Sequence, residues 1–349
     1  MLAVLGIIAV VWGLGRALRL PGAVVWGVIA LIYLAVLVLQ LTLPAGQPLR
    51  VATGGSAAGW LILGAVAALV AGYVRGLEWL RARAQPEAEA QVPQGPFAPG
   101  ELNRYARHIV LRELGGPGQK KLKDSRVLVI GAGGLGSPVL LYLAAAGVGR
   151  IGVVDDDAVD GSNLQRQVIH SDEKIGSPKV QSAMQAMQAL NPYVEVRPYE
   201  RRLSGEIAEA LFEDYDLVID GTDNFEARYL VNRTCVKLGK PLISGAIAQW
   251  EGQVSLFDPA RGGPCYECVF PEAPAPGLAP SCAEAGVVGP LPGVVGSIMA
   301  LEAVKAIAGA GQGLRGEMLI FDGLYGESRK VRLKPRADCP VCGGRGAKG

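Results

Sequence analysis

A glycine-rich segment, residues 131–136 (GAGGLG), directly follows the apolar run 126–130 and precedes a helical pattern. Its glycines are Gly131, Gly133, Gly134 and Gly136. Glycines here let the backbone approach a phosphate closely, and the start of the following helix offers free N–H groups. A second apolar run ends at Asp155, whose carboxylate is placed to accept hydrogen bonds from ribose hydroxyls. This arrangement predicts a nucleotide-binding βαβ unit.

Charged residues after the predicted strands favour ATP over a nicotinamide cofactor. A third apolar run, residues 216–220, ends just before Asp223, while Arg166 and Lys179 follow the second strand. Because parallel strands bind ligands at their carboxyl ends, Asp155 and Asp223 should meet the glycine segment at one edge of the sheet. Two acids, an arginine and a lysine suit a metal-bound triphosphate, whereas hydride transfer does not need such a cluster.

The same cluster indicates which reaction the site can catalyse without a general base. A carboxylate nucleophile is already ionised at neutral pH, so its attack on the α-phosphate of ATP needs no general base. What the reaction needs is alignment and charge neutralisation. Arg166 and Lys179 can supply the second, and Mg²⁺ held by aspartate can supply both. The chain has only two histidines, which agrees with this chemistry.

Four of the six cysteines form two Cys-x-x-Cys pairs, Cys265/Cys268 and Cys339/Cys342. This spacing predicts a closed, tetrahedral structural zinc site with no catalytic role. The alternatives are two disulfides or four unligated thiols, and a cytoplasmic location disfavours disulfides. Cys282 lies apart from both pairs, in a Pro/Gly-rich stretch.

These motifs require a doubly wound, mostly parallel α/β sheet of the Rossmann type, carrying a zinc knuckle, over residues 101–349. The strands are expected at the three apolar runs described above and near Val331. The apolar pattern 294–309 predicts a helix that packs against the sheet or a second subunit.

The front of the chain differs in composition, and mean hydropathy over the whole chain is +0.28. Three apolar stretches predict transmembrane helices over about 2–18, 22–41 and 55–75, within an anchor spanning residues 1–80. A signal peptide or a buried core helix explains two long uncharged runs less well. Residues 81–100 lack apolar periodicity and predict a flexible linker.

Basic residues near the spans set the expected orientation. Arg16 and Arg19 lie between the first two spans, and Arg75, Arg81 and Arg83 follow the third, whereas only Arg50 lies between the second and third. The positive-inside rule then places the catalytic domain on the cytoplasmic side of the cell (inner) membrane. Net charge is +2 and no dense basic run occurs, so no nucleic-acid partner is expected.

Residues 101–349 resemble the MoeB/ThiF/HesA family, the bacterial relatives of the ubiquitin-activating enzymes. The resemblance rests on RYARHIVLRELGGPGQKKL, GAGGLGS, DDDAVDGSNLQRQ, GSPKV, DGTDN, GAIAQWEGQ, CYEC, SCAEAGVVGPLPGVVGS and CPVCGG. It implies a homodimer in which Asp223 holds Mg²⁺ and Arg107 reaches into the partner's site. Besides the glycines, the ATP-binding residues it implies are Asp155, Asp157, Ser162, Asn163, Leu164, Gln165, Arg166, Lys179, Asp223 and Asn224.

The resemblance further implies adenylation of the C-terminal glycine of a ubiquitin-fold sulfur carrier, with the small subunit of molybdopterin synthase as the favoured substrate. A separate sulfur donor is expected, because no rhodanese-like domain follows Gly349. Cysteines matching Cys282 transfer sulfur in thiamine-pathway relatives. Three alternatives remain open: the thiamine-pathway carrier, a tRNA-modifying dehydratase, and a membrane-anchored NAD-binding module or oxidoreductase.

Overall fold

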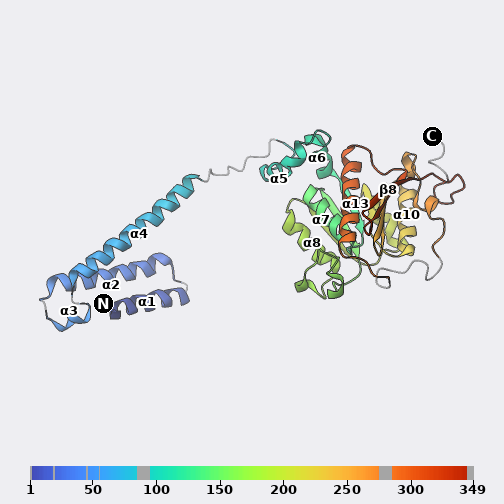
Figure 1. The fold of residues 1–349 in the computed structure, drawn as a ribbon. Helices are drawn as coiled ribbons and strands as arrows, with labels where there is room; N and C mark the ends of the chain where they lie inside the picture. The colour runs from blue at the N-terminus through green and yellow to red at the C-terminus, as the bar shows by residue number, and fades with distance from the viewer. Residues whose placement is uncertain are drawn as a thin grey trace. The chain divides into compact units, whose positions relative to one another are not determined.

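The computed structural model describes residues 2–18, 20–44, 46–54, 56–84, 95–274 and 285–343. The chain divides into two compact units, Met1–Val92 and Pro93–Gly349, each described here by itself (Figure 1). The division falls inside the predicted linker 81–100. That predicted segment includes helical residues at both ends, while residues 85–94 lie outside the described residues.

The first unit consists of apolar helices: α1 (Leu2–Ala17), α2 (Gly22–Thr42), the short α3 (Pro48–Ala52) and α4 (Ala57–Ala84). By length and composition, Gly22–Thr42 and Ala57–Leu80 could each cross a membrane, whereas α1 is shorter. Only 17% and 6% of their most apolar windows are buried within the protein. Most of this apolar surface is therefore left without a protein partner inside the described unit.

Three side-chain hydrogen bonds stabilise the connection between α2 and α4. The Gln40 side-chain amide donates to the Arg50 carbonyl at 2.9 Å and to the Thr53 hydroxyl at 2.7 Å. The Trp60 indole N–H donates to the Thr53 carbonyl at 3.0 Å, and its ring packs with Val4 and Val36 in a buried cluster. Such side-chain contacts satisfy backbone groups where the chain turns between two apolar helices.

The second unit is built on an eight-stranded sheet in the order β3-β2-β1-β4-β5-β6-β7-β8. Five parallel strands come first along the chain: β1 (Arg126–Ile130), β2 (Arg150–Asp155), β3 (Glu195–Glu200), β4 (Leu217–Asp220) and β5 (Leu242–Ala248). Three strands add in antiparallel fashion: β6 (Glu251–Phe257), β7 (Glu317–Asp322) and β8 (Glu327–Arg332). The predicted Rossmann-like α/β sheet is confirmed, with an antiparallel extension at one side.

Helices cover both faces of this sheet, as Figure 1 shows for α7, α8 and α13 on one side and α10 on the other. The helices of the unit are α5 (Pro99–Ile109), α6 (Gly115–Asp124), α7 (Gly136–Ala146), α8 (Lys179–Leu190), α9 (Gly205–Glu213), α10 (Phe225–Leu238), α11 (Tyr266–Val269) and α13 (Pro290–Ala308). Successive residues of β1 alternate between the two cores, with Val127 and Val129 in one and Leu128 and Ile130 in the other. A strand buried on both faces explains its continuous apolar run.

Helix α13 resembles a membrane span in length and composition, and half of its most apolar window is buried within this unit. It packs against α7, β5 and β6, with Val295 and Met299 fully buried. The helix predicted at 294–309 is confirmed and packs against the sheet, and it begins four residues earlier, at Pro290. Burial against the sheet accounts for its apolar face.

Candidate active site and cysteine cluster

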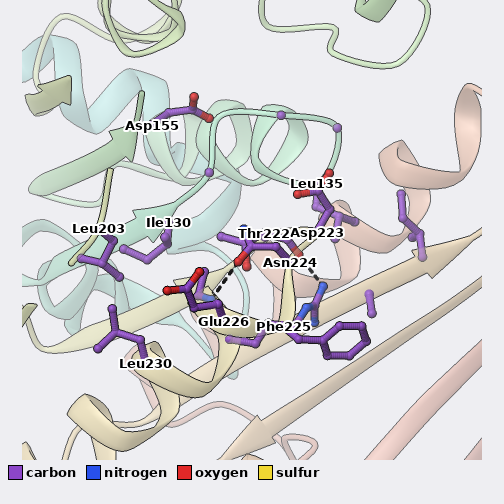
Figure 2. Close-up of a pocket in the computed structure, with 18 of the residues that line it drawn as sticks. Ile130, Leu135, Asp155, Leu203, Thr222, Asp223, Asn224, Phe225, Glu226 and Leu230 are labelled. Atoms are coloured by element: carbon purple, nitrogen blue, oxygen red, sulfur yellow. Dashed lines mark hydrogen bonds between the residues drawn. The ribbon is translucent and has the colours of Figure 1, made fainter. Parts of the chain in front are cut away.

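A pocket of about 1120 Å³ opens where β1, β2 and β4 end. The strand order reverses direction at β1, because the chain moves from β1 to β2 on one side and reaches β4 on the other. Loops after neighbouring strands diverge at such a point and leave a crevice. Figure 2 shows the side chains that line this crevice.

The glycine loop between β1 and α7 forms one wall. Gly131 has a φ of +96°, a conformation that L side chains rarely adopt. A Cβ added at Gly136 would lie 2.0 Å from the Gly131 carbonyl oxygen, so only glycine permits this turn. Gly131, Gly133 and Gly134 line the pocket, whereas Gly136 lies beneath the loop as the first residue of α7.

Asp155, at the end of β2, ties its own loop to the glycine loop. Its carboxylate accepts hydrogen bonds from the Ala132 backbone N–H at 2.7 Å and the Asp157 backbone N–H at 2.9 Å. Burial raises the pKa of Asp155, although nearby Lys179 and the two backbone N–H groups oppose the shift. The contacts hold the carboxylate at the pocket edge that neighbours β1.

Two cations line the same pocket. Lys179 begins α8, its side chain is 5% exposed, and its ammonium group lies 2.6 Å from the Asp157 carboxylate. The Arg166 guanidinium donates to the Asn163 side-chain oxygen at 2.7 Å. Each cation is thus held by a polar neighbour while it faces the pocket, which suits an anionic ligand.

The turn Gly221–Asn224, between β4 and α10, forms the opposite wall. Asp220 is fully buried and accepts from the Thr222 backbone N–H at 3.0 Å and the Thr222 hydroxyl at 2.7 Å. Asn224 caps α10 by accepting from the Ala227 backbone N–H at 2.8 Å. Between these two fixed residues, the exposed Asp223 side chain lies at the pocket (Figure 2).

Apolar side chains occupy another part of the pocket. Ile130, Leu203 and Leu230 come from β1, from the loop before α9 and from α10, and Figure 2 shows them grouped together. An apolar slot beside a polar wall is the usual arrangement for a flat heterocycle joined to a charged group.

The structure brings together most of the predicted nucleotide-binding residues. Those that line the pocket are Gly131, Gly133, Gly134, Asp155, Asp157, Arg166, Lys179, Asp223 and Asn224. Those that do not line it are Gly136, Ser162, Asn163, Leu164 and Gln165. The Ser162 hydroxyl donates to the Asp160 carboxylate at 2.6 Å, and the Asn163 side-chain oxygen accepts from Arg166 at 2.7 Å.

The predicted residue Arg107 is exposed on α5 and does not line the pocket. Cys282 lies outside the described residues, between Pro274 and Ala285, which both line the pocket.

Sequence reasoning missed two buried pocket residues, Arg228 and Tyr266, which are 6% and 4% exposed. Arg228 lies on the face of α10 that also carries Val231 and Cys235, at positions three and seven residues later. A charge on the buried face of a helix requires a partner. This spacing could have indicated that Arg228 is buried. For Tyr266, the sequence gives no indication beyond its position between two cysteines.

The predicted four-cysteine cluster is confirmed. The Sγ atoms of Cys265 and Cys339 are 3.6 Å apart, those of Cys268 and Cys342 are 3.5 Å apart, and all four lie within 4.8 Å of one another. A tetrahedral Zn²⁺ with Zn–S bonds of about 2.3 Å requires sulfurs about 3.8 Å apart. The separations therefore fit one zinc ion.

Backbone groups around the cluster also favour a metal. Burial raises the pKa of Cys339, but the backbone N–H groups of Cys342 and Val341 lower it, and the net shift is downward. Gly343 has a φ of +58° and closes the turn after the second pair by donating to the Cys339 carbonyl at 2.9 Å. N–H groups aimed at a sulfur stabilise the thiolate that a metal needs.

His170 supports the glycine loop from behind. One ring nitrogen lies 2.9 Å from the Ala132 carbonyl oxygen and the other 2.9 Å from the Ser182 hydroxyl. A carbonyl can only accept, so one ring nitrogen donates to Ala132; in the neutral ring, which we assign here, the other nitrogen accepts from the Ser182 hydroxyl. Burial lowers the pKa of His170, in agreement with this assignment.

His170 should make the stability of this unit pH-dependent. Because folding lowers its pKa, the unfolded chain binds the proton more tightly. The stabilisation is complete above the unfolded value of about 6.5 and is lost as pH falls below it toward the folded pKa. We expect the thermal midpoint to fall between pH 7.5 and 5.5, and the fall to be smaller in His170→Gln. His108→Gln is the matched control, and equal slopes in wild type and His170→Gln would contradict the assignment.

Comparison with protein families and curated proteins identifies relatives of the second unit. The ThiF family matches residues 105–341. A sulfur carrier protein adenylyltransferase from Thermus thermophilus is 52% identical over 247 residues, covering 70% of this chain and 91% of the relative. The SAMP-activating enzyme E1 of Haloferax volcanii is 49% identical over 243 residues, covering 70% of this chain and 89% of the relative.

A longer relative and a solved structure extend the comparison. A probable adenylyltransferase/sulfurtransferase, MoeZ of Mycobacterium tuberculosis, is 50% identical over 251 residues, which are 71% of this chain and 64% of the relative. The crystal structure of Escherichia coli MccB with ATP superposes with a TM-score of 0.60 at 23% identity, covering 69% of this chain and 75% of that chain. At this identity the superposition supports the fold alone.

Proposed function

This chain belongs to the ThiF family, and we propose that it is an ATP-dependent adenylyltransferase that activates the C-terminal carboxylate of a ubiquitin-fold sulfur carrier protein. One observation carries the proposal. A single pocket combines a glycine loop, the Asp155 carboxylate, two cations and an exposed acid after β4. Relatives with 52% and 49% identity are named as activating enzymes of this kind.

The pocket suggests how ATP would lie. The adenine ring would fit the apolar slot of Ile130, Leu203 and Leu230, and Asp155, at the end of β2, would accept from the ribose hydroxyls. The phosphates would then follow the glycine loop, where backbone N–H groups at the start of α7 point toward them. Arg166 and Lys179, which line the same pocket, would neutralise the charge of the phosphates.

The chemical step follows from this placement. The carrier carboxylate attacks the α-phosphorus, the bond to the bridging oxygen breaks, and pyrophosphate leaves while an acyl-adenylate forms. Charge develops on the phosphate oxygens, and fixed cations stabilise it because they need not reorganise during the reaction. Asp223 is exposed at the pocket and would hold Mg²⁺, which would supply charge screening and alignment of the phosphates. Deprotonation of the nucleophile is unnecessary.

We favour the small subunit of molybdopterin synthase as the carrier, with the thiamine-pathway carrier as the alternative. Sulfur would come from a separate donor protein. Purified full-length protein should catalyse ATP–pyrophosphate exchange with Mg·ATP only when its carrier is present. Both carriers should be tested side by side. Failure of both to support exchange, or ATP-independent NAD binding in its place, would argue against adenylation.

We propose that the four cysteines hold a structural zinc ion, since their spacing and burial fit one tetrahedral site. We also propose that the first unit anchors the enzyme in the cell (inner) membrane with the second unit in the cytoplasm. The two long apolar helices with little buried surface support the anchor. Protease should cut the second unit in inverted membrane vesicles and spare it in intact spheroplasts, and the reverse result would contradict the orientation.

We propose that the active enzyme is a homodimer in which Arg107 of each copy completes the partner's site. Arg107 is exposed on α5 and is outside its own pocket, which suits a contribution in trans. Arg107→Ala and Asp223→Asn should each be inactive alone. Subunits mixed by co-expression should recover about a quarter of wild-type exchange, because half the dimers are mixed and each has one intact site. No recovery in verified mixed dimers would contradict the proposal.

A further inference from the structure

Gln167 is a further buried residue of the pocket, and its side-chain oxygen has no hydrogen-bond donor among the described residues. The residue follows Arg166 in the chain, and both residues line the pocket. Gln167 is 5% exposed, and its Oε1 atom is buried. The amide therefore lies at the pocket without being used in full by the surrounding protein.

The main chain fixes the place of this amide. The Gln167 backbone N–H donates to the Asn163 carbonyl at 3.0 Å, and the Gln167 carbonyl accepts from the His170 backbone N–H at 3.1 Å. The His170 ring in turn donates to the Ala132 carbonyl at 2.9 Å. The turn that carries Gln167 is therefore held against the glycine loop.

The amide nitrogen is the end of the Gln167 side chain that lies beside this loop. A Cβ added at Gly133 would lie 3.5 Å from the Gln167 Nε2 atom. A Cβ added at Gly134 would lie 3.7 Å from the Cγ atom of Arg166. A neutral N–H donor and the side chain of a cation thus lie beside consecutive glycines of the loop.

The buried Oε1 atom has an energetic cost that packing does not explain. A buried acceptor without a donor destabilises the folded chain, because it has lost its hydrogen bonds to water. Native structures contain few such groups. A methionine side chain has a similar length and would fill the same space without this cost. A ligand contact made by the other end of the amide explains why a polar side chain stands here.

We propose that Gln167 is a nucleotide-binding residue whose Nε2 group donates to a phosphate oxygen of ATP at the glycine loop. Phosphate oxygens accept hydrogen bonds, so they require the donor end of the amide, which is the end beside Gly133. The amide adds a directed contact, whereas Arg166 and Lys179 supply the charge. This assignment rests on the proposed function, because it requires a nucleotide with phosphates in this pocket.

Calorimetric titration of the full-length protein in detergent tests this contact. Gln167→Met should bind a non-hydrolysable ATP analogue with Mg²⁺ about 10- to 100-fold more weakly than wild type, as expected for loss of one buried hydrogen bond to a charged group. Adenosine, which has no phosphate, should bind wild type and Gln167→Met with equal affinity. Gln167→Glu keeps the shape of the side chain but replaces the donor by an anion, and should bind the analogue at least as weakly as Gln167→Met.

The thermal midpoint without nucleotide should change in the opposite direction. Gln167→Met removes the unpaired Oε1 atom, so its midpoint should rise by about 2–4 °C. Gln119→Met is the matched control, because Gln119 is fully buried in α6, donates to the Ala146 carbonyl at 2.8 Å and contacts the His108 ring at 3.0 Å. Gln119 does not line the pocket. The control should have a lower midpoint than wild type and bind the analogue with wild-type affinity.

The outcomes separate this assignment from adenylation. If wild type and Gln167→Met bind the analogue equally well, the Gln167 assignment is overturned and adenylation is not. An equal loss of affinity for adenosine would also overturn it, as would a midpoint that falls in Gln167→Met as far as in Gln119→Met. A wild-type protein that binds no analogue would count against adenylation and against the Gln167 contact together.

Discussion

Replacing Asp223 by asparagine should lower the rate of ATP–pyrophosphate exchange by about 10²- to 10³-fold, comparable to removing one preorganised electrostatic group from an active site. The side chain keeps its size, and the turn keeps the Asp220 and Asn224 contacts that hold it. Only the negative charge that would bind Mg²⁺ is lost. Higher Mg²⁺ concentrations should recover part of the rate, because weaker ion binding is offset by mass action.

Asp216→Asn is the matched control for this substitution. Asp216 immediately precedes β4, at the end of the strand opposite the Asp223 turn, and pairs with Arg126 at 2.8 Å on the surface. An exposed pair of this kind contributes little to stability, so exchange activity should stay at the wild-type rate. A fully active Asp223→Asn would show that the acid after β4 takes no part in the reaction.

Replacing Cys339 by serine should remove the zinc and destabilise the second unit strongly. Cys265 and Cys339 are 74 residues apart in the chain, so the ion closes a long loop. In the chain-entropy treatment of cross-links, such a loop is worth about 4 kcal/mol, which corresponds to a fall of roughly 10 °C in the thermal midpoint. A chelator should produce the same shift in wild type and none in Cys339→Ser.

Cys235→Ala separates metal loss from a general loss of core packing. Cys235 is buried in α10 among apolar side chains, and burial raises its pKa well above the usual value. This variant should lose some stability by leaving a small cavity, yet retain one zinc ion per chain. Retention of zinc and of the wild-type midpoint by Cys339→Ser would contradict a structural metal site.

Much of the sheet could be predicted because its signals are local. Val127–Ile130 is a continuous apolar run. The positive φ of Gly131 and the close approach of its carbonyl oxygen to Gly136 exclude side chains at both positions, so the sequence must carry glycine there. The cysteine cluster was predictable for a similar reason, since ligand type and spacing are set by the metal. The antiparallel extension by β6, β7 and β8 was not, because pairing partners depend on contacts distant in the chain.

The buried wall of the pocket shows what local signals cannot supply. Arg228 and Tyr266 are 38 positions apart, and nothing in either segment indicates that both line the same pocket. The predicted loop residues Ser162 and Asn163 illustrate the converse. Their polar side chains suggested direct ligand contact, whereas in the structure they hold Asp160 and Arg166. The same polar residue types occur where a side chain stabilises a loop and where it binds a ligand, so the sequence alone does not separate the two roles.

The apolar helices of the first unit were likewise predicted from uncharged runs, although α4 continues to Ala84, beyond the expected end near 75. The hydrogen bonds among Gln40, Thr53 and Trp60 were not predicted. The sequence shows isolated polar residues between apolar helices, but only the structure shows which backbone groups they hydrogen-bond.

Adenylation of a carrier protein is tested most directly by the mass of the carrier itself. Full-length enzyme, Mg·ATP and a carrier ending in glycine should be incubated with pyrophosphatase, and the intact carrier analysed by mass spectrometry. We predict that the carrier gains the mass of one AMP group at its C-terminus, and that a carrier lacking the terminal glycine gains none. A carrier that stays unmodified while the enzyme binds ATP would contradict the proposed function.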